Sequence, residues 1–223
     1  VGFVLGAMGA DYYPRLTAVA SDNVKVHQMV NEQSQISILL SLPGLAVMMI
    51  FAPLIINIFY AEAFATAVPV LRWCILGVLG RVFSWPMGFV LLAKGKGKVF
   101  FVTELFGSVL HLVGVYFFTQ IWGLDGAGIA FMVLYVAHTG LMLFVMRKLV
   151  GASWDHHTLK LAFLSLFVML ILMFNCTLNS NQFAMWSTNV VVLVGVTWFC
   201  LKELSRQSDI SLQTLLTKFR LKK

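Results

Sequence analysis

Long apolar stretches alternate with short polar connectors along most of this chain. The apolar stretches cover residues 36–59, 73–93, 99–120, 127–146, 159–177 and 185–201. Each is close to the roughly 20 residues that an α-helix needs to cross a bilayer. The pattern therefore predicts six complete membrane-spanning helices, the first of them kinked at Pro43 and Pro53.

The N-terminal part has a different pattern. Residues 1–10 are apolar and predict the end of one further, partial membrane helix, whereas residues 11–34 are polar with apolar positions at helical spacing. We interpret the polar segment as a cytoplasmic pair of amphipathic helices at the surface, broken near Ser21, Asp22 and Asn23. This divides the chain into 1–34, a transmembrane bundle at 35–203 and a basic cytoplasmic tail at 204–223. Because the chain starts at Val1 inside an apolar run, we expect it to be the C-terminal part of a longer protein.

Composition agrees with a membrane protein. Hydrophobic residues make up 60% of the 223 and charged residues only 11%, against ~25% charged in a soluble domain. The net charge of +7 comes from residues scattered between apolar blocks, so no single basic patch indicates nucleic-acid binding. Cys74, Cys176 and Cys200 are too far apart to form a disulfide framework or a metal motif. The predicted fold class is an all-α polytopic membrane bundle, with no cofactor and no metal.

The basic residues also predict an orientation. All sixteen except Arg72 and Arg81 fall in 11–34, in the connectors 94–98 and 147–160, or in the C-terminal residues from Lys202 on. These segments alternate with connectors whose only basic residue is Arg72. Cytoplasmic loops are the ones enriched in Lys and Arg. We therefore expect a multi-pass protein whose C-terminus is cytoplasmic.

Arg81 is the principal candidate for a functional residue. It stands near the middle of the block 73–93, where a charge costs ~3 kcal/mol or more unless it faces a partner or a water-filled cavity. A guanidinium suits a pyrophosphate or another anionic group geometrically. The alternative is a structural ion pair with Glu104 or with a carboxylate on another part of the protein. Arg72, at the start of the same block, is a second candidate for anion binding.

A polar, small-residue stripe follows on the next predicted helix. Glu104, Gly107, Ser108, His111 and Gly114 fall on one helical face. Either this stripe faces a cavity, with Glu104 and His111 taking part in proton coupling, or it is a close-packed helix interface. Of the two we prefer close packing.

Other polar residues in the blocks have simpler interpretations. His138 stands alone in its span and is expected to be a satisfied interior histidine instead of a proton relay. Lys94 and Lys96 belong to a basic hairpin that either attracts phosphate head groups at a cytoplasmic entrance or only determines topology. Asp125 is expected to cap the following helix.

No catalytic or metal-binding constellation is evident. His156 and His157 have only Asp155 nearby in the sequence, with no third ligand at a clear spacing. The sequence also has no nucleophile elbow, no paired intramembrane carboxylates and no phosphate-binding glycine loop. We therefore do not expect an enzyme.

Several short motifs occur together in a fixed order. They are Ala10-Asp11-Tyr12-Tyr13-Pro14-Arg15-Leu16, then Asn31-Glu32-Gln33, Phe51-Ala52-Pro53-Leu54-Ile55-Ile56 with Phe59-Tyr60 and Phe64-Ala65, Leu91-Leu92-Ala93-Lys94-Gly95 and Gly123-Leu124-Asp125-Gly126-Ala127-Gly128-Ile129-Ala130. Their series, which covers most of residues 1–149, resembles the polysaccharide flippases of the multidrug/oligosaccharidyl-lipid/polysaccharide exporter superfamily, the O-antigen or Wzx-like translocase type. The last two spans match this family only in hydrophobicity.

The resemblance implies a fold and a function. Such proteins have two lobes of helices around a central cavity and flip undecaprenyl-pyrophosphate-linked sugar units across the bacterial inner membrane. This chain would supply most of the C-terminal lobe, and its partners would be the lipid-linked oligosaccharide, membrane lipids and the missing N-terminal lobe. Arg81, Arg72, Lys94 and Lys96 would bind the substrate. The alternatives are a drug or cation antiporter of the same superfamily and a membrane-embedded enzyme of polysaccharide synthesis.

Overall fold

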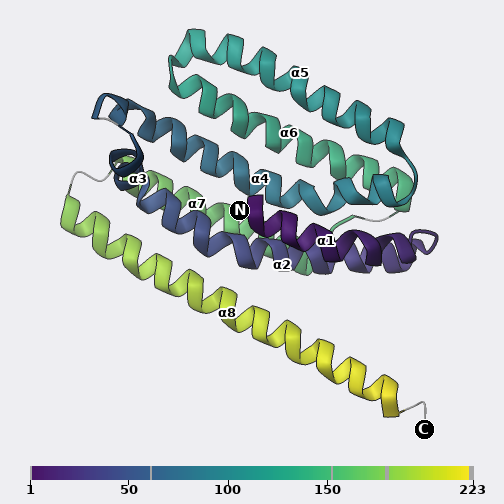
Figure 1. The fold of residues 1–223 in the computed structure, drawn as a ribbon. Coiled ribbons are helices and arrows are strands. Elements are labelled where there is room, and N and C mark those ends of the chain that lie inside the picture. Colours follow the sequence, from purple (N-terminus) through teal and green to yellow (C-terminus); the bar gives the residue numbers. More distant parts are fainter. Residues whose placement is uncertain (1, 61, 152, 179–180, 221–223) are drawn as a thin grey trace.

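The computed structural model describes residues 2–60, 62–151, 153–178 and 181–220, without the side chains of 3, 4, 62, 63 and 208–220. All regular structure in these ranges is helical (Figure 1). The elements are α1 Gly2–Ala18, α2 Asn23–Ile50, α3 Ala52–Phe59, the 3₁₀ helix η1 Glu62–Ala67, α4 Val68–Ala93, α5 Gly97–Trp122, α6 Asp125–Val150, α7 His156–Leu178 and α8 Gln182–Arg220. Within the described residues, six helical segments are long and apolar enough to cross a membrane. The predicted polytopic all-α membrane bundle is confirmed.

The first spanning helix differs from its expected bounds. We placed it at 36–59, but α2 runs from Asn23 to Ile50 and a new helix, α3, begins at Ala52. The break between α1 and α2 lies near Asp22, as expected, because its carboxylate accepts hydrogen bonds from the amides of Val24 and Lys25. Pro53 does not kink a span; it lies in the first turn of α3, where its missing N–H costs no helical hydrogen bond.

The polar half of α2 is continuous with the apolar half, and two of its polar side chains find partners on the segment that leads into α7. Asn31 is only 3% exposed, and its Oδ1 accepts from the Asp155 amide at 2.8 Å. Gln35 donates to the Thr158 hydroxyl at 2.9 Å, in the first turn of α7. Residues 23–34 therefore extend a spanning helix and do not form a separate surface helix. The domain division at residue 34 stays a prediction, although α2 itself passes through that position.

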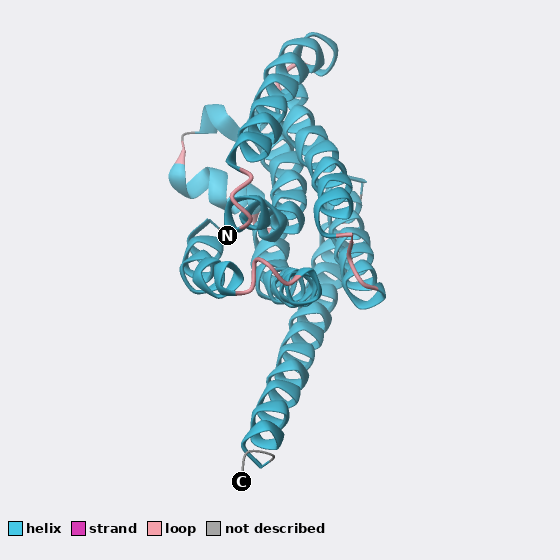
Figure 2. Ribbon diagram, turned by 90° about the vertical axis from the view of Figure 1, so that its right-hand side faces the viewer, coloured by secondary structure: helices cyan, strands magenta, loops and turns pink. Residues whose placement is uncertain are grey.

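The helices are arranged in a series around α4. One side of α4 packs against α6, and another side packs against α2. Beyond α6 lies α5, whereas α7 and α8 pack against α2, so that α5 and α8 lie at opposite edges in Figure 1. Figure 2 shows the C-terminal part of α8 extending beyond the other helices.

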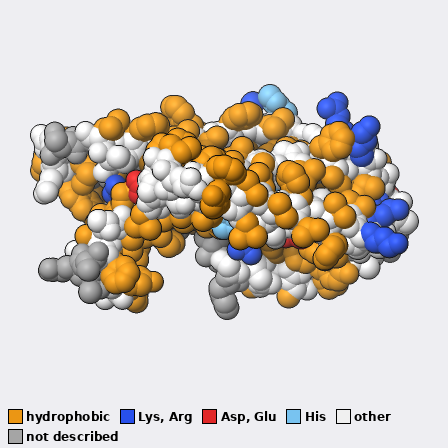
Figure 3. Space-filling model, turned by 90° about the horizontal axis from the view of Figure 1, so that it is seen from above, with side chains coloured by type: hydrophobic (Ala, Val, Ile, Leu, Met, Phe, Trp, Pro, Cys, Tyr) orange, Lys and Arg blue, Asp and Glu red, His pale blue; other side chains and the backbone are white. Residues whose placement is uncertain are grey.

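The basic connectors gather at one end of the bundle. Lys94, which follows α4, donates from Nζ to the Ala20 carbonyl and to Asn23 Oδ1, both at 2.7 Å, and so joins the α4–α5 turn to the α1–α2 turn. Gly95 makes that turn tight with a φ of +67°. In Figure 3, Lys and Arg side chains gather mainly at one end of a largely hydrophobic surface. The grouping agrees with the expected alternation of connectors between two membrane sides.

At the opposite end of the bundle, the start of α6 differs from the expectation for Asp125. Leu124 precedes α6 and Asp125 is the first helical residue, without a side-chain capping bond. The expected cap at Asp125 is therefore wrong. Its carboxylate lies in the first turn, where the partial positive charge of the helix N-terminus favours it.

Candidate functional site

Helices α4 and α6 pack closely against each other along a seam that borders the candidate site. A Cβ added to Gly80 would lie 2.9 Å from the Cβ of Tyr135, and one added to Gly128 would lie 2.7 Å from the Val70 carbonyl oxygen. Thr139 on α6 donates its hydroxyl to the Gly80 carbonyl at 3.0 Å. Small residues let two membrane helices approach this closely, since the gain comes from packing and hydrogen bonds. The seam fixes the position of Arg81, which follows Gly80.

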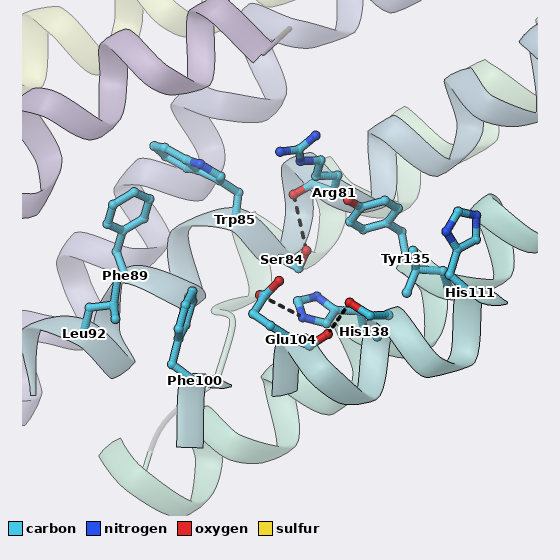
Figure 4. A pocket seen from close by; sticks show the side chains of 14 residues that line it. Arg81, Ser84, Trp85, Phe89, Leu92, Phe100, Glu104, His111, Tyr135 and His138 are labelled. Carbon is cyan, nitrogen blue, oxygen red and sulfur yellow. Dashed lines mark hydrogen bonds and ion pairs between the residues drawn. The ribbon is translucent and has the colours of Figure 1, made fainter. Parts of the chain in front are cut away.

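A cavity of about 370 Å³ opens beside this seam, between α4, α5 and α6 (Figure 4). That volume lies within the range of small-molecule sites. Its lining combines charged, polar and aromatic side chains. They are Arg81, Ser84, Trp85, Gly88, Phe89 and Leu92 of α4, Phe100, Glu104, Gly107, Ser108 and His111 of α5, and Leu134, Tyr135 and His138 of α6.

Arg81 presents a cationic group to the cavity without a carboxylate partner. Its side chain is exposed, and no described carboxylate lies within 4.0 Å of it. The backbone carbonyl of Arg81 accepts a hydrogen bond from the Ser84 hydroxyl, one turn further along α4, at 3.3 Å. The expected alternative of an ion pair between Arg81 and Glu104 is therefore wrong in this structure. The guanidinium is free to meet an anion.

Glu104 instead faces His138. Glu104 Oε1 lies 3.6 Å from His138 Nε2, and the Glu104 side chain is 55% exposed against 11% for His138 (Figure 4). This distance is slightly beyond a hydrogen bond, and His138 Nδ1 is buried without a described partner. His138 is thus neither alone nor the satisfied interior histidine that we expected.

The polar, small-residue stripe on α5 both lines the cavity and packs against α6, the two arrangements that the sequence left open. Glu104 and His111 line the cavity, but Gly107 lies against α6, where an added Cβ would come within 3.3 Å of Leu134. At Gly114 the added Cβ would be 3.4 Å from the Cβ of Ala130. One edge of the stripe therefore faces the cavity and the glycine edge packs. Whether Glu104 and His111 couple transport to an ion stays a prediction.

Aromatic rings form the other half of the cavity, and sequence reasoning did not identify them. Trp85 and Phe89 stack edge to face with centroids 4.8 Å apart. They are four residues apart on α4, and Phe100 stands four residues before Glu104, so helical spacing contained the signal.

The α1 tyrosine motif supports this aromatic wall. Tyr12 is 2% exposed, its hydroxyl donates to the Pro86 carbonyl at 3.2 Å, and its ring lies 6.0 Å from that of Phe89. Proline cannot continue the regular backbone hydrogen bonding of α4. Tyr12 therefore binds the helix at the point where Pro86 weakens it.

The remaining predicted substrate residues lie elsewhere. Arg72 is 9% exposed and donates to the Cys176 carbonyl at 3.1 Å, in the last turn of α7. Lys94 is occupied with the α1–α2 turn, and Lys96 is exposed in the α4–α5 turn. None of the three lines the cavity with Arg81. Their role in substrate binding stays a prediction.

No metal centre is visible in the described ranges. No group of three or more His, Cys, Asp or Glu side chains comes together there. His157 instead lies 3.2 Å from Glu203 of α8, and the three cysteines carry free thiols. The contact between His157 and Glu203 joins α7 to α8.

Comparison with known proteins supports the family resemblance that the sequence motifs indicate. The chain is 26% identical over 153 residues to the lipopolysaccharide biosynthesis protein WzxC of Escherichia coli K12. The matched region is 67% of this chain and 30% of WzxC, so the chain spans less than a third of that relative's length. No family profile and no solved structure matches the chain. The resemblance to Wzx-like proteins that the motifs carried is thus confirmed by a distant similarity to WzxC.

Proposed function

We propose that this chain is part of a transporter that flips an anionic, lipid-linked oligosaccharide across the bacterial inner membrane. The observation that carries the proposal is Arg81, an unpaired cation in a cavity between three spanning helices. The similarity to WzxC, a lipopolysaccharide biosynthesis protein, supports a polysaccharide-related substrate. Undecaprenyl-pyrophosphate-linked repeat units of the O-antigen type fit this chemistry.

Arg81 binds the pyrophosphate or an acidic sugar in this proposal. A guanidinium stays charged at physiological pH and pairs with phosphate oxygens through two parallel hydrogen bonds. The rings of Trp85 and Phe89 offer apolar faces on which the adjacent sugar rests. The chain supplies one lobe of the cavity, and the remaining lobe belongs to the rest of a longer protein, as the 30% coverage of WzxC supports. The basic end, with the C-terminus, faces the cytoplasm.

The test compares Arg81→Ala, Arg81→Lys and Arg147→Ala in the full-length protein. Arg147 is a matched control, because it is exposed at the basic end and outside the cavity. Flipping of a fluorescent lipid-linked oligosaccharide in proteoliposomes is expected to fall at least about tenfold in Arg81→Ala, as two lost charge-assisted bonds imply. Arg81→Lys keeps the charge without the fork and retains part of the activity. Wild-type flipping by Arg81→Ala at normal protein level would overturn the proposal.

A drug or cation antiporter is the second candidate, favoured by the half-exposed carboxylate of Glu104 in the same cavity. In that case Glu104→Gln abolishes efflux of a cationic dye, and Arg81→Ala leaves it intact. Parallel assays with the dye and with the lipid-linked oligosaccharide distinguish the two transporters.

A further inference from the structure

A second hollow lies on the outer face of the bundle, between α5 and α6. It is a groove of about 400 Å³ whose walls include Val102 and Phe106 of α5 and Leu141 and Val145 of α6. Positions 102 and 106 point roughly opposite to position 104 of the cavity, since two residues advance ~200° around a helix. The groove and the Arg81 cavity therefore open on different sides of α5.

The groove walls offer hydrocarbon and no free polar group. Thr103 is the only hydroxyl residue in the lining, and its Oγ1 already donates to the Phe100 carbonyl at 2.8 Å. Val102 is 61% exposed and Phe106 is 48% exposed, so the walls are accessible from outside. An occupant must consequently be apolar along most of its length.

The mouth of the groove is cationic. Lys98 contributes its alkyl stem to the groove wall at the basic end, and its exposed side chain has no described carboxylate within 4.0 Å. Lys148 follows Val145 by three residues on the same face of α6, and its Nζ lies 5.8 Å from the Phe144 ring. From Lys98 to Phe106 the groove extends ~12 Å along α5, close to the ~15 Å depth of one leaflet's hydrocarbon.

We propose that this groove is a binding site for one anionic phospholipid, with an acyl chain between α5 and α6 and its phosphate at Lys98. Apolar walls, leaflet-scale length and an unpaired ammonium at the membrane surface together match such a lipid and no polar ligand. Basic pockets between membrane helices on the cytoplasmic side bind anionic head groups in this way. The site is independent of the proposed transport function.

The experiment counts lipids retained by the purified full chain in native mass spectrometry. The probes are phosphatidylglycerol and phosphatidylcholine with identical acyl chains. One phosphatidylglycerol is expected to bind about fivefold more tightly than phosphatidylcholine, the factor that one lysine near the head group contributes. Lys98→Gln removes this preference. Lys202→Gln, at an exposed position of α8 outside the groove, keeps it.

A second pair of variants tests the acyl-chain part. Val102→Trp fills the groove from an exposed position, so folding is not at risk, and it lowers retention of both lipids. Leu112→Trp, at a 73% exposed position of the same helix outside the groove, leaves retention unchanged. Glycerol phosphate, which lacks acyl chains, does not compete.

Several outcomes would overturn the proposal. Equal affinity for the two lipids in the unaltered chain is one, and an undiminished preference in Lys98→Gln is another. Undecaprenyl phosphate displacing phosphatidylglycerol at a lower concentration would assign the groove to a polyprenyl lipid instead. A lipid-free dimer that Val102→Trp dissociates would assign it to a second copy of the chain.

Discussion

Helices α4 and α5 have the same length and hydropathy but opposite environments. Both have 26 residues, and each contains an 18-residue stretch with a mean hydropathy of 1.7. Yet 67% of that stretch is buried for α4 and only 11% for α5. In a bilayer an apolar side chain is as well solvated by lipid as by protein, so hydropathy determines that a helix crosses the membrane and not where it lies in the bundle.

Small residues and hydrogen bonds explain why α4 is buried and α5 is exposed. In α4, Gly77 admits the ring of Phe131 and Gly80 admits the Cβ and backbone of Tyr135, both from α6, and the other side of α4 meets α2. Glycines in α5 are also turned toward α6, but the rest of its surface is large exposed side chains such as Leu112. Helix α4 is therefore packed on two sides, against α6 and α2, and carries Arg81 on its remaining face.

The largest expected effect comes from breaking the α4–α6 seam with Gly128→Leu. Its new Cβ would overlap the Val70 carbonyl and the Cβ of Trp73, both of which belong to the packed helix α4. We expect a loss of ~3 kcal/mol or more in the free energy of unfolding, or no accumulation in membranes. Gly140→Leu is the control on the same helix, since nothing lies within 4 Å of its added Cβ. Membrane abundance and thermal unfolding in detergent provide the measurement, and equal behaviour of the two variants would contradict the seam.

Truncation of one leucine in each helix tests the contrast in burial directly. Leu79→Ala in α4 removes a side chain that is 0% exposed and is expected to cost ~2–4 kcal/mol. Leu112→Ala in α5 removes one that is 73% exposed and should change stability by less than ~0.5 kcal/mol. Chemical denaturation in mixed micelles compares them. A large cost at Leu112 would show that another part of the protein covers α5.

Two arginines of α4 sharpen the comparison within one helix. Arg72→Ala leaves the Cys176 carbonyl without its charged donor and should cost ~2 kcal/mol in thermal unfolding. Arg81→Ala should leave the unfolding temperature nearly unchanged, because Arg81 is exposed and pairs with no described carboxylate. If Arg72→Ala proved neutral, its hydrogen bond would not be structural and its predicted role in substrate binding would gain weight.

The smallest effect is expected outside the membrane, at the start of α2. Hydrogen bonds from the Lys25 amide and the Lys25 ammonium lower the pKa of the Asp22 carboxyl below its ordinary 3.8. A lowered folded-state pKa contributes stability that is fully present above pH ~4 and is lost as the pH falls through the folded value. Asp22→Asn retains a capping side chain but cannot titrate. The difference in unfolding temperature between the two proteins should therefore shrink from pH 6 to pH 3, and a constant difference would contradict the assignment.

The sequence predicted the spanning helices, but it predicted the cavity around Arg81 only in part. Five of the six spans lie close to the expected residues, because a long apolar run has few other stable forms in a bilayer. Arg81, Glu104 and His111 were identified, and they do line one cavity. The alternative pairing of Arg81 with Glu104 is wrong, since Glu104 faces His138 and not Arg81. Helical spacing defines which residues share a face but not which helix that face meets.

The sequence by itself determined that this chain has six stretches long and apolar enough to cross a membrane, which are helical in the described residues. It also predicted which connectors share a side and that Arg81 lies within a spanning stretch. Those properties follow from the cost of leaving charges and backbone groups unsatisfied in hydrocarbon, a cost that each segment meets on its own. Only the tertiary structure decided that the polar half of α2 continues a spanning helix, because Asn31 and Gln35 find partners more than a hundred residues away. It likewise decided that Arg72 is bound to α7 while Arg81 faces a cavity, since both depend on which helices pack against α4.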